Sequence, residues 1–147
     1  MKKVKNILLF LLIGLAAYFY VQQGERISEN SDHRHEGLNQ EVLSAVHKKM
    51  SNVWVAGEGK VSRLLSDDNY GDRHQRFILR LSPEHTVLIS HNIDIAHRIN
   101  KINQGDLVEF YGEYEWNSKG GVIHWTHHDP RGKHPGGWLK HNGRVYK

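Results

Sequence analysis

The feature that most constrains the fold of this chain is the strict alternation of side chains over residues 107–116. Apolar or small residues such as Phe110 hold the even positions, and the odd positions include Glu109, Glu113 and Glu115. Successive side chains of a β-strand point to opposite faces, whereas an α-helix repeats about every 3.6 residues. The segment therefore predicts a β-strand with one face in a core and the other toward water.

Four further segments show the same two-residue period: residues 52–65, 74–81, 86–92 and 121–130. Turn-forming residues separate most of them, and residues 93–103 form a longer connector. The first segment carries Gly57 and Gly59 on one face, which is typical of a strongly bent strand at a barrel corner. We therefore predict an all-β fold, a small five-stranded OB-fold-like Greek-key barrel. A β-sandwich, which would have about seven strands, is the second choice.

The barrel is predicted to occupy only part of the chain. Changes of composition divide the sequence into five parts. These are an N-terminal signal anchor or signal peptide (residues 1–23), a linker (24–37), a short helix (38–50), the barrel (51–130) and a basic C-terminal tail packed on the barrel (131–147).

The N-terminal part has the pattern of an export signal. Lys2, Lys3 and Lys5 precede an apolar run from Ile7 to Val21, and neutral flanking residues extend it to the roughly 20 residues that a membrane helix needs. Lysines at this end keep the N-terminus in the cytoplasm. We expect a single-pass anchor in the inner membrane with the domain facing the periplasm. Cleavage as a signal peptide would instead give a soluble periplasmic protein.

Cysteine and charge exclude several classes of site. The chain has no cysteine, so disulfides, thiolate metal sites and cysteine nucleophiles are absent. Without the three N-terminal lysines, 17 basic residues face 16 acidic ones. Polyanion binding needs a concentrated basic surface, and only the tail after Asp129 offers one. Nucleic acid is therefore not an expected partner, and the sequence indicates no oligomeric state.

Barrel topology would gather polar side chains at one end. If the third and fifth strands pair in parallel, one rim collects the loop after the first strand and the ends of the third and fifth strands. The opposite rim receives ordinary turn residues. The first rim is thus a candidate binding site for a small polar ligand, with five candidate contact residues: His74, Arg76, His91, Asn92 and Asp94.

The same rim is a candidate site for a divalent metal such as zinc. On an extended fifth strand, His127 and Asp129 lie two residues apart and share a face. Adding His91 would give three nitrogen or oxygen ligands and one open position, as in catalytic zinc sites. The alternative is that these side chains only hydrogen-bond the backbone at the barrel mouth.

Several motifs between Val53 and the C-terminus form a recognisable set: residues 74–77, 91–94, 112–116, 122–130, 137–138 and 141–143. Together they resemble an uncharacterised bacterial domain-of-unknown-function family, number 3465. The resemblance covers the chain from about Val53 to the C-terminus and implies no activity, cofactor or catalytic residue.

We therefore expect an exported OB-fold domain that binds a small polar ligand or a divalent metal at a histidine-rich rim. A metal-dependent hydrolase, acting on phosphoesters, is the first alternative. A module that binds a partner protein or a nucleic acid is the second. The sequence contains no nucleophile elbow and no HExxH motif, so it does not decide whether the protein is an enzyme.

Overall fold

The computed structural model describes residues 12–26 and 37–147. Residues 12–26 are helical and belong to a different compact unit from the rest, which spans His35–Lys147. Among the described residues, no helix combines the length and the apolar character needed to cross a membrane. The lysines and the first part of the predicted span lie outside the described residues, as does most of the predicted linker.

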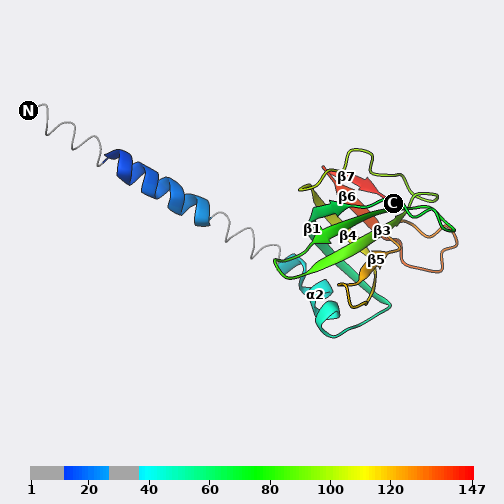
Figure 1. Ribbon diagram of the computed structural model, residues 1–147. Coiled ribbons are helices and arrows are strands. Elements are labelled where there is room, and N and C mark those ends of the chain that lie inside the picture. Colours follow the sequence, from blue (N-terminus) through cyan, green and yellow to red (C-terminus); the bar gives the residue numbers. More distant parts are fainter. Residues whose placement is uncertain (1–11, 27–36) are drawn as a thin grey trace, which may run out of the picture. The chain divides into compact units, whose positions relative to one another are not determined.

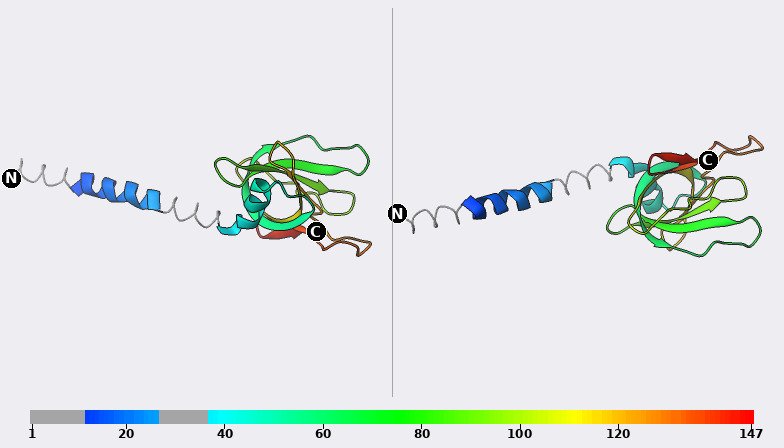
Figure 2. Two further views of the ribbon diagram at one scale, coloured as in Figure 1. Left: turned by 90° about the horizontal axis from the view of Figure 1, so that it is seen from below. Right: turned by 90° about the horizontal axis from the view of Figure 1, so that it is seen from above.

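Five strands close into a barrel in the order β1-β2-β3-β5-β4, and β4 pairs back with β1 (Figures 1 and 2). The pairing of β3 with β5 is parallel, and the other four pairings are antiparallel. A closed five-stranded barrel and the parallel pairing are therefore confirmed. The strands are β1 (Val53–Leu64), β2 (His74–Arg80), β3 (Thr86–Asn92), β4 (Leu107–Glu115) and β5 (Val122–His124).

Strand β1 bends because it serves two neighbours. Its first part pairs with β4 and its last part with β2, and the two pairings meet at Lys60. The register shifts between Val61 and Arg63, as at a β-bulge. A Cβ atom added at Gly59 would lie 2.8 Å from the carbonyl oxygen of Arg80. Glycine is therefore needed where the bent strand approaches β2.

The inward faces of the strands form the core. On β4 the predicted alternation is confirmed, because Val108, Phe110 and Tyr114 are fully buried and Leu107 is 41% exposed. Burial of these side chains is the main favourable contribution to folding. The rest of the core comes from all the strands, from α2 and from the connector, and includes Val42, Val61, Phe77, Leu79, Ile89, Ile99, Ile123 and Leu139.

Helix α2 (Gln40–His47) lies across one end of the barrel (Figures 1 and 2). Asn39, directly before it, is fully buried. Its side-chain amide donates to the carbonyl oxygens of Glu58 and Leu81, and its side-chain oxygen accepts from the backbone N–H of Glu58. These hydrogen bonds attach the start of the helix to β1 and to the end of β2.

The C-terminal tail adds a hairpin that the sequence analysis did not identify. Strand β6 (Trp138–His141) pairs with β4, and β7 (Arg144–Tyr146) pairs with β6. Leu139 is fully buried, and Lys140 lies 2.8 Å from the carboxylate of Glu109. The basic charges of the tail are thus partly neutralised by the acidic face of β4.

The fifth strand is much shorter than predicted. It ends at His124, because Trp125 adopts a left-handed conformation (φ 54°) that breaks the ladder. The chain then folds back, and the N–H of Gly137 donates to the carbonyl oxygen of His127 at 2.9 Å. His127 and Asp129 therefore do not share one face of a strand, contrary to the prediction, because both lie in a loop.

Candidate functional site

A pocket of about 550 Å³ opens at the barrel rim where the first loop and the ends of β3 and β5 meet. Three stretches that are distant in the sequence contribute to it: the start of β2 with the loop before it, the end of β3 with the connector after it, and β5 with the loop after it. The lining residues are Asp72, His74, Ser90, Asn92, Ile95, His124, Trp125, His127, Asp129, Pro130 and Arg131. We call this the rim pocket.

The rim pocket contains four of the residues singled out from the sequence. His74 and Asn92 line it from β2 and β3, and His127 and Asp129 line it from the loop after β5. His74 and Asn92 are directly paired across the β2–β3 ladder. These four polar side chains, which the sequence analysis assigned to one rim of the barrel, therefore line one pocket at that rim.

Two other predicted contact residues hold loops rather than line the pocket. The guanidinium of Arg76 donates to the carbonyl oxygen of Ser66 at 3.0 Å and lies 3.7 Å from Asp68. The carboxylate of Asp94 accepts from both the backbone and the side chain of Arg73 at 2.7 Å. These contacts lower the pKa of Asp94. Both side chains thus stabilise the edges of the rim.

His91 lies beneath the rim pocket, in the protein interior. Its side chain is fully buried, with Nδ1 2.8 Å from the hydroxyl of Thr126 and Nε2 3.3 Å from the carbonyl oxygen of His97. The pKa of His91 is lowered to about 4, mainly by burial and to a smaller extent by the nearby His127 and His74. Both ring nitrogens are engaged, so His91 joins β3 to the loop after β5 and to the connector.

The structure does not bring His91, His127 and Asp129 within reach of one ion. The carboxylate of Asp129 accepts from the backbone N–H groups of Arg131, Lys133 and His134 at 2.7–2.9 Å, which lowers its pKa. It therefore caps its own loop. The Nδ1 atom of His127 lies 2.7 Å from the carbonyl oxygen of His128.

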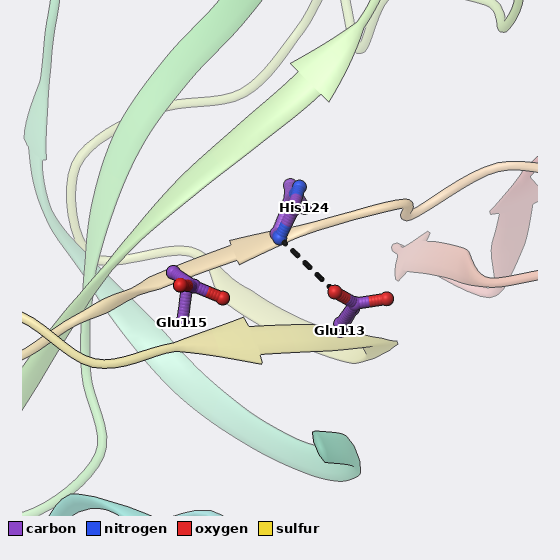
Figure 3. A group of neighbouring side chains, drawn as sticks. All are labelled: Glu113, Glu115 and His124. Carbon is purple, nitrogen blue, oxygen red and sulfur yellow. Dashed lines mark ion pairs between the residues drawn. The ribbon is translucent and has the colours of Figure 1, made fainter. Parts of the chain in front are cut away.

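A different group of potential metal ligands lies beside the rim pocket. The group consists of Glu113, Glu115 and His124, each of which offers one ligand atom. These atoms lie within 4.8 Å of one another, and no other group of this kind occurs among the described residues. Figure 3 shows the three side chains on neighbouring strands β4 and β5. Glu113 and Glu115 are two apart on β4, and His124 is directly opposite Glu113 on β5. We call these three residues the carboxylate–histidine cluster.

His124 belongs to both the cluster and the rim pocket. Its Nε2 atom lies 3.8 Å from the nearest carboxylate oxygen of Glu113. Burial lowers the pKa of His124, although the charges of Glu113 and Glu115 act in the opposite direction. The lowered pKa favours the neutral ring near pH 7, and its Nε2 atom has no hydrogen-bond partner.

The cluster was missed in the sequence because its members belong to different strands. The parity of residues 107–116 does place both glutamates on the outer face. Only the hairpin register, in which Glu113 faces His124 across the β4–β5 ladder, adds the imidazole. That register depends on the conformation of residues 116–121, where Gly120 and Gly121 both have positive φ angles.

A second pocket, of about 720 Å³, lies at the opposite end of the barrel between α2 and the β2–β3 turn. It is larger than the rim pocket, but its polar groups are partly paired with one another. His47 and His85 lie 3.2 Å apart, and His85 is also 3.2 Å from the hydroxyl of Ser82. It therefore offers fewer free polar groups for a ligand.

Comparison with known proteins identifies the family of this chain, but it assigns no activity to it. A family model described as "Protein of unknown function (DUF3465)" matches residues 30–147, which is most of the chain. No curated protein matches. The matched region includes the whole barrel, the rim pocket and the carboxylate–histidine cluster.

Proposed function

The chain belongs to the DUF3465 family, and we propose that its barrel is an OB-fold module that binds a small polar ligand in the rim pocket. The observation that carries this proposal is the convergence of His74, His124 and His127 on one pocket of about 550 Å³. Side chains from β2, β3 and the β1–β2 loop form the surface that OB-folds use for ligands. The strand order β1-β2-β3-β5-β4 is the order expected of that fold.

The lining of the rim pocket favours a ligand that both donates and accepts hydrogen bonds. In His74 and His127, Nδ1 lies 2.8 and 2.7 Å from a backbone carbonyl oxygen, so a neutral ring keeps Nε2 as an acceptor for the ligand. The side chain of Asn92 has both donor and acceptor groups. Arg131 adds a positive charge and Asp72 a negative one. Trp125 and Ile95 supply apolar walls, as in other small-molecule sites. The pocket volume of about 550 Å³ lies within the range of about 300–1,000 Å³ that is typical of small-molecule sites.

Screening a library of small polar compounds by NMR tests this function. The expected result is that imidazole resonances of His74, His124 and His127 shift together, because these rings share the pocket. Ser90→Trp should fill the pocket from the outer face of β3 and weaken binding by about tenfold or more. Ser90→Ala leaves the space open and should change affinity by no more than about threefold.

The opposite pocket is the internal control for this screen. Its histidines, His47 and His85, lie at the α2 end of the barrel. Compounds that shift these two rings as strongly as the three rim rings would be binding without selectivity. That result, or equal affinity for Ser90→Trp and the unchanged protein, would contradict the proposed function.

We also propose that the N-terminal segment holds the barrel on the periplasmic face of the inner membrane. Support comes from the sequence alone, in the lysines before Ile7 and the apolar run that follows. Protease added to spheroplasts should digest the barrel, and the protein should stay with the membrane fraction after a salt wash. A barrel that resists protease until the cells are lysed would place it in the cytoplasm.

A further inference from the structure

We propose that Glu113, Glu115 and His124 bind a divalent first-row transition-metal ion, with Zn²⁺ held more tightly than Mg²⁺ or Ca²⁺. This metal site is separate from the proposed function, because binding of a small polar ligand in the rim pocket does not require a metal. Figure 3 shows the arrangement that carries it, two carboxylates and an imidazole on adjacent strands.

The strand register holds the three ligands in place. Two glutamates two residues apart on β4 share the outer face, and the non-sequential partner His124 faces Glu113 across the antiparallel ladder. Their ligand atoms lie within 4.8 Å of one another. Zinc bonds to nitrogen and oxygen are about 2.0–2.2 Å long, which places ligand atoms about 3–3.5 Å apart. Side-chain rotations that bring the atoms together by up to about 1–2 Å would complete the site.

The cluster contains a polar atom that nothing in the structure satisfies. The Nε2 atom of His124 is buried and has no hydrogen-bond partner, and it is the one side-chain atom of this kind among the described residues. The distance of 3.8 Å to Glu113 is too long for a hydrogen bond. Buried polar groups are almost always paired, so an unpaired nitrogen that faces two carboxylates indicates that a further group belongs between them.

In the described part of the chain, the only basic group near Glu113 is the imidazole of His124, at 3.8 Å, which carries a charge only when it is protonated. The side chain of Glu113 is only 12% exposed, and within residues 12–26 and 37–147 no lysine or arginine forms an ion pair with Glu113 or Glu115. By contrast, Glu109 on the same face is paired with Lys140 at 2.8 Å. A half-buried pair of carboxylates is costly without a cation. A divalent ion would neutralise both charges and satisfy His124 at once.

The ligand types select the class of metal. Ca²⁺ and Mg²⁺ prefer sites made of oxygen atoms, whereas an imidazole beside carboxylates suits zinc and its first-row neighbours. Three protein ligands would leave a fourth position for water or another molecule. Because His124 also lines the rim pocket, a bound ion would border that pocket.

Zinc titration of the untagged full chain, read with a competing chromophoric chelator, tests the site. We expect one tight Zn²⁺ per chain and no competition from millimolar Ca²⁺. Glu113→Gln, Glu115→Gln and His124→Gln should each weaken zinc binding by about tenfold or more, because each removes one of three ligands. Glu109→Gln is the matched control on the same strand face and should leave affinity within about twofold. Circular dichroism verifies that every variant remains folded.

Replacing Zn²⁺ by Co²⁺ gives a spectroscopic test of which residues bind the metal, and this test does not rely on counting bound ions. A cobalt complex in this site should show visible absorption bands that change with His124→Gln and persist in Glu109→Gln. Zinc binding that is unaffected by all three ligand variants would overturn the proposal and place the ion on other histidines. Ser90→Trp separates the two proposals, because it blocks the rim pocket and leaves the cluster intact. Weaker ligand binding with unchanged zinc binding in this variant is the result that both proposals predict. Unchanged ligand binding would contradict the proposed function alone, and loss of zinc binding would contradict the metal site alone.

Discussion

Phe110→Ala is expected to lower the free energy of unfolding by about 3–5 kcal/mol. Phe110 is fully buried on the inner face of β4, where it packs in the centre of the barrel. A Cβ atom added at Gly57 on the neighbouring strand would lie 2.7 Å from its ring, so the ring fills the space that the glycine leaves. Truncation would remove the buried ring and leave a cavity that the closed barrel cannot easily collapse.

Urea-induced unfolding, followed by tryptophan fluorescence, measures this loss. Leu107→Ala is the matched control, because Leu107 lies on the same strand with the opposite parity and is 41% exposed. Its expected cost is below about 1 kcal/mol. Equal costs for the two substitutions would contradict the assignment of the inner and outer faces of β4.

The second large effect is a loss of stability in mild acid that originates at His91. The pKa of this ring is lowered from 6.5 to about 4 in the folded protein. Above pH 6.5 the ring is neutral in both folded and unfolded chains, so its full contribution to stability is present. As the pH falls from 6.5 toward 4, the unfolded chain binds a proton that the folded chain does not. The free energy of unfolding should therefore decrease by about 2 kcal/mol between about pH 7.5 and about pH 5.

His91→Gln isolates this contribution from other titrating groups. The half-buried ring of His124 also has a lowered pKa and acts in the same direction, so the total decrease includes more than one histidine. The variant should be less stable near neutral pH, because contacts with Thr126 and His97 are weakened. Between about pH 7.5 and about pH 5, the free energy of unfolding of the variant should nevertheless decrease less than that of the unchanged protein. The difference between the two decreases should be about 2 kcal/mol. An NMR titration that gives His91 a midpoint near 6.5 in the folded protein would contradict this account.

The two ends of the barrel have different structural roles. At one end, Asn39 and α2 close the barrel with buried hydrogen bonds and apolar contacts. At the other end, polar side chains line a pocket of about 550 Å³. Because the α2 end closes the hydrophobic core, the rim at the opposite end can carry polar groups that contribute little to core packing. This separation is consistent with function being located on loops that a rigid scaffold positions.

The predicted hydrolase alternative stays a prediction. A metal-dependent hydrolase needs a bound ion with an open coordination position next to a substrate pocket. The carboxylate–histidine cluster and the rim pocket share His124, so the zinc titration also bears on this alternative. Turnover of a phosphodiester would have to depend on the metal and be lost with the ligand variants.

The sequence alone determined strands β1–β4 and which of their faces is buried. A period of two residues is a local property of the chain, and it predicted β1–β4 to within one or two residues because strand periodicity reflects which side chains are buried. The parity of β4 placed Phe110 inside and Glu113 outside. The five strands of the barrel and a parallel closure between β3 and β5 followed from the pattern of segments and from strand directions. The β6–β7 hairpin did not.

Only the tertiary structure decided which polar side chains meet. Trp125 ends β5 with a positive φ angle, and this single backbone change moved His127 and Asp129 off the predicted strand face. His91 became a buried structural residue because Thr126 folds over it. The cluster at Glu113, Glu115 and His124 depends on the hairpin register, which is set by a pairing between strands. Local periodicity carries no information about such contacts, because they are fixed by turn conformation and by the closure of the barrel.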